Sequence, residues 1–455
     1  MNTVPELAAI ANLPVGELMA TLDDFLAPVL GNLPDRRLRA AATLAVRGSA
    51  GSQSPVVTQM ARMVAGAEGQ VWPTAKRCYR FCANPRFSHR DLLKGLDAIT
   101  QRTVAAAQPA YLVVAVDPVN FEKPYTAALE GVSTVMKSTP PGPRGEKRLT
   151  AGYPAITATI VNLATPVISY ANWFSYLTDD FLSENREIER AIRTTRALFP
   201  ADRLRFVTDS GLDDQKVFAQ MHSVQAEFVI RASHLDRIVE VYNDRLDRWE
   251  RESLADLAAT VPLSVHLQVA FTHARTVRTV TIGLGWLKVR VPGRAQVLWV
   301  LVAHDPERDR DLVLLTNVPI IHQAAATTLY TEWRCRSRIE HTDRFDQEAG
   351  LQIEGIRVQT LERMRRLFVL VLLAALFVDH SGATWPHQAV LWLRRLGGKL
   401  GQHADLDGPC VLLAGISAVL VTLATLTFAD HDPFVFDNPV WPTSMAGNGP
   451  PLVGG

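Results

Sequence analysis

Two short apolar runs, each ending in an aspartate, constrain the fold of this chain most strongly. Residues 111–117 read Tyr-Leu-Val-Val-Ala-Val-Asp, and residues 203–209 read Arg-Leu-Arg-Phe-Val-Thr-Asp. A continuous apolar run of this length predicts a strand buried on both faces, which is typical of the parallel part of an α/β sheet. Open sheets of this kind place their sites at the carboxyl ends of the strands. We therefore expect Asp117 and Asp209 to share one site.

The remaining patterns predict a multi-domain α/β (α+β) chain. The charge pattern of residues 183–199 predicts a helix, with Ser183 as its N-cap. Alternating apolar and polar residues after position 226 predict antiparallel strands. The expected units are a helical N-terminal domain at 1–105, the first part of an α/β core at 106–225, a β-strand insertion at 226–322, the rest of the core at 323–380, and a helical region with an irregular tail at 381–455.

The charge balance does not by itself predict a nucleic-acid partner. Lysine and arginine number 47 and aspartate and glutamate 46, so the net charge is only +1. Basic clusters at 76–90, 186–205 and 357–366 are each explained equally well by a solvated helix face. Four cysteines in 455 residues argue against a disulfide framework. No signal peptide is evident at the N-terminus, and a reducing cytoplasm is the expected compartment.

One stretch raises a membrane alternative. Residues 410–428 form a run of nineteen residues without a charge, which is long enough to cross a bilayer. The run contains serine and threonine, and the apolar segment 367–378 is too short to span. We interpret residues 410–428 as a buried core or dimer-interface helix, so no membrane contact is expected.

A third carboxylate lies on an arginine-rich helix further along the chain. Trp333, Arg336, Glu340 and Gln347 are spaced three, four and seven residues apart, which puts them on one helix face, and Arg344 joins them. Alone, this pattern is explained by surface ion pairs. Together with the two strand-end aspartates, Glu340 completes a set of three carboxylates that suits divalent metals at the edge of a sheet.

This spacing resembles the signature helix of DDE cut-and-paste transposases of the insertion-sequence-four group. That signature is Tyr, two residues, Arg, three residues, Glu, six residues, Lys. Arg336 and Glu340 match it, whereas Trp333 and Gln347 stand in place of the Tyr and the Lys. Blocks that resemble the family's first-acid, second-acid and N-terminal segments occur at 114–132, 208–231 and 79–86. The resemblance covers roughly residues 35–380, and Ser210 departs from the arginine that usually follows the second acid.

The resemblance implies an RNase H-like catalytic core interrupted by a β insertion. It implies that Asp117, Asp209 and Glu340 hold two Mg²⁺ ions, which Mn²⁺ can replace, with Asp117 bridging the pair. The partners would be transposon terminal inverted repeats and target DNA, bound by a homodimer that cleaves and joins strands through hairpin ends. The compartment would be the bacterial cytoplasm, at the nucleoid. The expected DNA-contacting residues are Trp333, Arg336, Arg344, Gln347, Lys123, Arg80 and Arg86.

Three alternatives stay open from the residues. The departures at Trp333, Gln347 and Ser210 are also what a catalytically inactive or domesticated DNA-binding descendant would carry. A metal-free hydrolase with two carboxylates, such as a glycosidase, is a second alternative. Other acids also compete: Asp209 is preferred to Asp213 and Asp214 because the apolar run ends there, and Glu340 is preferred to Glu348 because of its spacing from Arg336.

Overall fold

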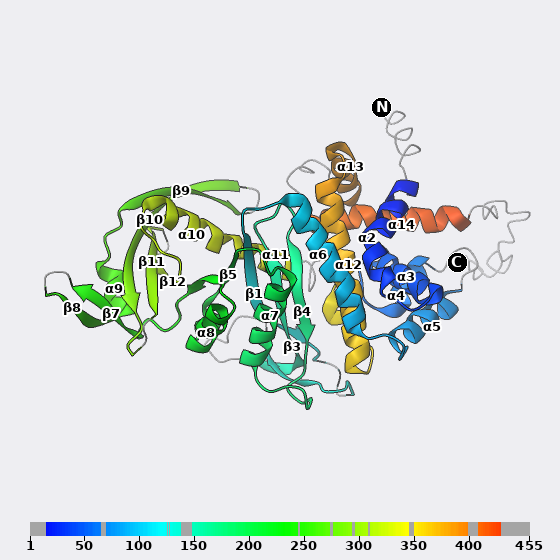
Figure 1. Cartoon of the computed structure of the whole chain (residues 1–455). Coiled ribbons are helices and arrows are strands. Elements are labelled where there is room, and N and C mark those ends of the chain that lie inside the picture. Colours follow the sequence, from blue (N-terminus) through cyan, green and yellow to red (C-terminus); the bar gives the residue numbers. More distant parts are fainter. Residues whose placement is uncertain are drawn as a thin grey trace, which may run out of the picture.

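Three regions follow one another along the molecule (Figure 1). Helices from both ends of the chain form a helical body at one end, a sheet flanked by helices lies in the middle, and a β-rich extension lies at the other end. The computed structural model describes residues 15–64, 70–124, 126, 128–137, 148–243, 246–273, 276–293, 296–307, 310–344, 350–398 and 408–428.

One mixed sheet of twelve strands runs through the middle and the extension. Its order is β2-β3-β1-β5-β6-β12-β11-β10-β7-β8, with β4 paired to β3 and β9 paired to β10. The strands of the middle region are β1 (Leu112–Glu122), β2 (Ser133–Met136), β3 (Leu149–Ile160), β4 (Val167–Trp173), β5 (Leu204–Thr208) and β6 (Glu227–Arg231). Those of the extension are β7 (Ile238–Asn243), β8 (Arg248–Ser253), β9 (Val265–His273), β10 (Thr276–Arg290), β11 (Val297–Asp305) and β12 (Arg310–Thr316).

The two apolar runs that the sequence singled out form neighbouring parallel strands. β1 pairs antiparallel with β3, β3 pairs antiparallel with β4, and β5 and β6 continue parallel to β1. The first five residues of β1 and all of β5 are buried. This confirms the prediction of strands covered on both faces, and it establishes a mixed α/β fold.

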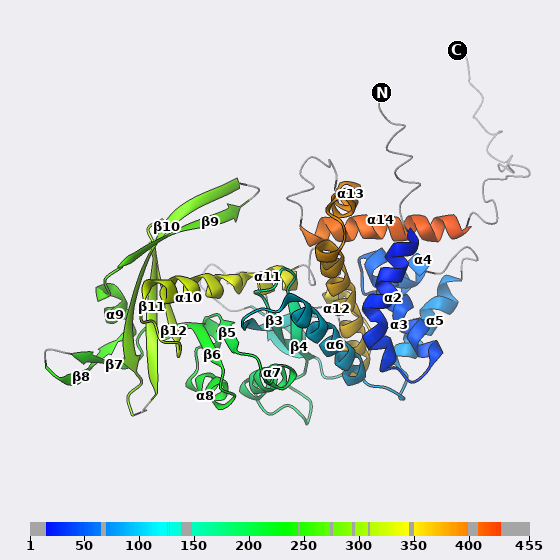
Figure 2. The same ribbon diagram turned by 45° about the horizontal axis from the view of Figure 1, so that its top comes forward.

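Helices cover both faces of the middle sheet. α7 (Glu184–Leu198) and α8 (Gln215–Ser223) lie on one face, and α10 (Gln323–Cys335) and α11 (Ser337–Arg344) follow each other across the opposite face (Figure 2). The hydroxyl of Ser183 accepts a hydrogen bond from the Arg186 amide at the start of α7, as expected of its N-cap. Two short 3-10 helices are also present. η1 (Ser210–Leu212) follows β5, and η3 (Ile353–Gly355) precedes α12 of the helical body.

The β extension is continuous with the middle sheet. β12 returns antiparallel to β6, and β6 itself pairs in parallel with β5. The predicted start of the insertion at 226 therefore falls one strand early, because β6 belongs to the parallel part of the sheet. The only helix described within the extension is α9 (Leu254–Thr260).

Helices from both ends of the chain share a single core, so the predicted N-terminal and C-terminal units are one body. It contains α2 (Val15–Gly31), α3 (Arg36–Ser52), α4 (Val57–Val64), α5 (Val71–Cys82), α6 (His89–Ala107), α12 (Leu361–Thr384), α13 (His387–Gly397) and α14 (Pro409–Phe428). Among the described helices, α12 alone has the length and apolar composition to cross a membrane, and most of its apolar window is buried in this core. α14 also packs inward: Leu413 and Ile416 are fully buried, and the Ser417 hydroxyl donates to the Gly51 carbonyl at 2.6 Å.

The crossing of α2 and α6 depends on a glycine. A Cβ at Gly95 would lie 2.3 Å from the Cα of Val29, which is far inside van der Waals contact with backbone. We expect Gly95→Ala to lower the free energy of unfolding by about 1–3 kcal/mol, because two packed helices would have to separate. Urea denaturation measures this. Gly31→Ala is the matched control, because nothing lies within 4 Å of a Cβ there. Equal stability of the two variants would contradict the close crossing.

Candidate functional site

The parallel pairing of β1 with β5 brings two of the predicted acids together. The register pairs Leu112 with Leu204 and Ala115 with Val207. Continued by two more residues, this register places Asp117 beside Asp209. Because side chains alternate along a strand, both acids point to the sheet face that α10 and α11 cover.

The third acid reaches the same face from a short helix. α10 ends at Cys335, and α11 begins at Ser337 after a single turn. α11 packs against β1, and Ile339 is fully buried among the apolar side chains of that face. Glu340 follows Ile339 directly, and its side chain is about half exposed (51%).

The charges of Asp209 and Glu340 both act on the pKa of Asp117. Burial, followed by the negative charge of Asp209, raises the pKa of Asp117 to about 7. This rise includes a smaller contribution from the charge of Glu340, and the guanidinium of Arg336 opposes it. Burial is the larger cause of the raised pKa, and the added effect of neighbouring carboxylates is expected where acids share a site without enough positive charge to balance them. Residues that lie far apart in the sequence thus form one uncompensated negative centre.

Trp333 and Arg336 shape the rim of this centre. The Trp333 Nε1 donates to the carbonyl oxygen of Thr208 at 3.0 Å, which fixes α10 to the end of β5 just before Asp209. Arg336 forms an ion pair with Glu340, and its guanidinium lies 5.8 Å from the Trp333 ring centroid. Arg336 is therefore the cation of the site, and the half-buried Trp333 positions it.

The donor set suits a hard divalent cation, although the acids are not already arranged as a cage. Within the described ranges, no group of three His, Cys, Asp or Glu side chains is placed to hold a metal. Glu340 is occupied by Arg336, and one oxygen of Asp209 accepts from the Gly211 amide at 2.7 Å. Three carboxylates with unbalanced negative charge are nevertheless the ligand type that Mg²⁺ and Mn²⁺ prefer.

The competing acids near Asp209 have structural roles. Asp213 is buried, accepts from the Ser233 amide at 2.8 Å and forms an ion pair with Arg237. Asp214 caps α8, accepting from the Lys216 amide at 2.7 Å. Neither is free to replace Asp209. Glu348, the competitor of Glu340, lies outside the described residues.

The structure separates the other predicted DNA contacts from this centre. The prediction that Lys123 contacts DNA is wrong for this conformation. Lys123 is only 4% exposed, and its ammonium donates to the carbonyl oxygens of Glu354 and Ile356. DNA cannot reach it in this conformation. Arg80 is exposed on α5, and Arg86 forms a surface ion pair with Asp35. α5 lies in the helical body, well away from β1 and β5 (Figure 1). The side chain of Arg344 and the whole of Gln347 lie outside the described residues.

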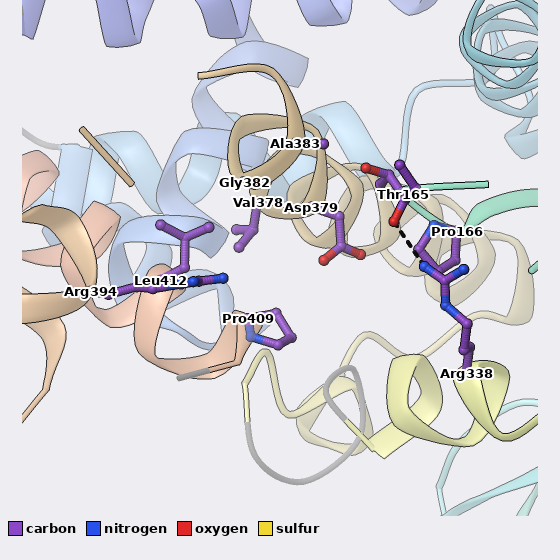
Figure 3. A pocket seen from close by; sticks show the side chains of 11 residues that line it. Thr165, Pro166, Arg338, Val378, Asp379, Gly382, Ala383, Arg394, Pro409 and Leu412 are labelled. Atoms are coloured by element: carbon purple, nitrogen blue, oxygen red, sulfur yellow. Dashed lines mark hydrogen bonds between the residues drawn. The ribbon is translucent and has the colours of Figure 1, made fainter. Parts of the chain in front are cut away.

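The sequence did not predict the charged residues that line a cavity beside α11. A cavity of about 430 Å³ lies between α11, α12 and α14, and Asp379 and Arg338 face it from different sides (Figure 3). Burial raises the pKa of Asp379 to about 7, although Arg338 opposes the shift. Arg394 of α13 is the other charged residue of the lining. No local sequence signal marks this cavity, because its walls come from five separate segments of the chain.

The raised pKa of Asp379 predicts a pH-dependent stability. In the folded protein the pKa of Asp379 is about 7, above the ordinary value of 3.8. Its contribution to the free energy of unfolding is therefore fully present below pH 4 and is lost as the pH rises through 7. Asp379→Asn, which stays neutral, is therefore expected to melt at a higher temperature than the wild type at pH 8. The two proteins should melt alike near pH 4. A pH-independent difference in thermal melting would contradict the assignment.

Comparisons with known proteins find only a distant structural similarity for this chain. No protein-family model and no curated protein matches it. Among solved structures, it is similar to a piggyBac transposase in a cryo-EM synaptic complex with hairpin DNA. The identity is 8% and the TM-score 0.41, and the match covers 92% of this chain and 80% of that one. A likeness this weak carries no argument, so the proposals below rest on the site.

Proposed function

We propose that this protein is a metal-dependent DNA transposase, which cleaves DNA at the ends of a mobile element and joins those ends to a target. The observation that carries the proposal is the convergence of Asp117, Asp209 and Glu340 on one face of the sheet, with the mutual electrostatic effect on Asp117. The resemblance of the Arg336–Glu340 helix to the insertion-sequence-four signature supports DNA as the substrate.

The strand order supports an RNase H-like core. Without the short β2, which also pairs with β3, the middle sheet runs β4-β3-β1-β5-β6, with β3 antiparallel to both β1 and β4, and with β5 and β6 parallel to β1. Asp117 lies on the first strand, and Asp209 directly follows β5, the fourth strand of this set.

The residues divide the chemical tasks between them. Asp117, Asp209 and Glu340 would hold the divalent ions, which when bound activate a water or a 3′-hydroxyl and stabilise the leaving oxygen. Asp117 and Asp209 are supplied by adjacent strands, so the sheet fixes their separation. Arg336 is presented at the same face, where its planar guanidinium suits a phosphate once Glu340 takes another partner. Trp333 holds Arg336 there through its bond to Thr208.

Cleavage of the DNA that flanks the gene tests the proposal. Linear duplexes that carry the genomic sequence on either side should be nicked and then cut by the purified protein with Mg²⁺ or Mn²⁺. Excess chelator should stop the reaction. A protein that binds these duplexes but never cuts them with either ion would be the catalytically inactive, domesticated DNA-binding descendant. Activity that survives the chelator would instead indicate a metal-free hydrolase.

A further inference from the structure

The helix that carries Glu340 needs an anchor of its own. α11 has eight residues, and it is separated from α10 by a turn in which the Arg336 amide bonds to the Trp333 carbonyl at 3.0 Å. A helix this short is not stable without tertiary contacts. Ile339 supplies one contact by burial in the sheet-facing core. The direction of the helix then depends on a second contact.

Arg338 provides that second contact. Its guanidinium donates to the carbonyl oxygens of Val161, Leu163 (2.6 Å) and Ala164 (2.8 Å), in the turn between β3 and β4. Figure 3 shows one of these bonds as a dashed line from Arg338 at the edge of the cavity. A planar guanidinium can satisfy several carbonyls at once, whereas an ammonium is a point charge without that fixed fork.

The turn to which Arg338 donates its hydrogen bonds is itself bonded to β1, the strand that carries Asp117. The Val161 amide donates to the Val113 carbonyl at 2.9 Å. The Asn162 side chain accepts from the Val113 amide at 3.0 Å and donates to the Tyr111 carbonyl at 2.9 Å. Arg338 therefore couples α11, which carries Glu340, to β1, which carries Asp117.

We infer that Arg338 is a positioning residue for the third acid, an inference that rests on the proposed function. Residues two apart on a helix are rotated by about 200°, so Arg338 points away from the three acids while Glu340 points toward them. Arg338 acts by holding α11 in the orientation that presents Glu340 to Asp117 and Asp209. It does not touch the reacting atoms.

The cavity beside Arg338 offers a way to restore the missing group. Removing this side chain enlarges a space that already measures about 430 Å³ and that Arg338 lines. Methylguanidinium has the same planar donors and is small enough to enter. The acceptors it would meet are the three carbonyl oxygens that Arg338 leaves, together with the carboxyl of Asp379 on the facing wall.

The test uses Arg338→Gly and Arg338→Lys in the full-length chain. Hydrogen exchange of the amides in residues 337–344 should accelerate about tenfold or more in both variants. Mn²⁺ affinity should fall by about 10- to 100-fold, as is typical when a group that orients a metal ligand is lost. Millimolar methylguanidinium should restore the wild-type exchange and affinity in Arg338→Gly. Arg334→Ala is the matched control, because the one described hydrogen bond of the Arg334 side chain goes to the Ala270 carbonyl in the extension.

The outcomes separate the two proposals. Unchanged exchange and unchanged Mn²⁺ affinity in both Arg338 variants would overturn the positioning role. A general loss of stability that methylguanidinium does not reverse, with no added exchange confined to α11, would also overturn it. If the wild type binds no Mn²⁺ and cuts no flanking DNA, the proposed function fails, and the exchange of α11 still decides whether Arg338 anchors the helix.

Discussion

Asp117→Asn, Asp209→Asn and Glu340→Gln are each expected to reduce DNA cleavage by about 10³-fold or more. Each substitution keeps the shape of the side chain and removes one negative charge from the set that would hold the ions. Binding of the same DNA should stay close to that of the wild type, because none of the three is a cation that contacts phosphate. Gel-shift titration and a cleavage time course on the flanking duplexes measure the two effects separately.

The acid substitutions should not act by unfolding the protein. The three carboxylates repel one another, so replacing one with an amide should leave thermal stability unchanged or raise it. Asp214→Asn is the control, because Asp214 caps α8 close to Asp209 and is expected to leave cleavage intact. Full activity in any one of the three acid variants would show that the acid was assigned wrongly.

Arg205→Met is expected to lower the free energy of unfolding by about 3–5 kcal/mol. Arg205 is buried, and it forms ion pairs with Glu227 at the start of β6 and with Glu332 on α10. The Tyr111 hydroxyl also bonds to Glu332. Removing the guanidinium leaves the buried Glu332 without its cationic partner, whereas Glu227 keeps an ion pair with Arg203. Loss of one member of a buried pair costs this much. Urea denaturation gives the value.

A surface pair supplies the control for Arg205. The exposed Arg193 forms an ion pair with Glu189 one helical turn earlier on α7, and Glu189 also pairs with Arg186. Arg193→Met removes the same charge and should cost less than about 1 kcal/mol. Similar losses for the two variants would mean that the Arg205 network contributes no more than a surface pair. The network also fixes Glu332 beside Trp333, so Arg205→Met should weaken DNA cleavage as well as stability.

The sequence predicted the two buried strands because their signal is local. A continuous apolar run specifies a strand covered on both faces, and the first five residues of β1 and all of β5 follow that pattern. β5 ends at Thr208, directly before Asp209, whereas β1 continues to Glu122, so the prediction that a strand ends at Asp117 was wrong. Ser183 and the acids that follow it specify the start of α7 in the same way. The helical spacing of Arg336 and Glu340 likewise placed them next to each other.

The errors arose where contacts between distant segments decide the structure. Lys123 directly follows β1 and carries a charge, so the sequence suggests an exposed cation. In the fold its ammonium is buried and bonds to carbonyls of Glu354 and Ile356, more than two hundred residues later in the chain. The residue pattern of β6 could not reveal that it pairs in parallel with β5 as well as antiparallel with β12 of the extension. Arg338 resembles its neighbouring arginines in sequence, and only the turn after β3 distinguishes it.

Binding of Mn²⁺ to the purified protein tests the central claim most directly, because it requires no knowledge of the DNA ends. Titration followed by electron paramagnetic resonance or calorimetry should show saturable binding to the wild type. Mg²⁺ should compete, and Asp117→Asn should lose the binding. Equal binding by the wild type and Asp117→Asn, or no binding by the wild type even with flanking DNA present, would contradict a metal site built from Asp117, Asp209 and Glu340.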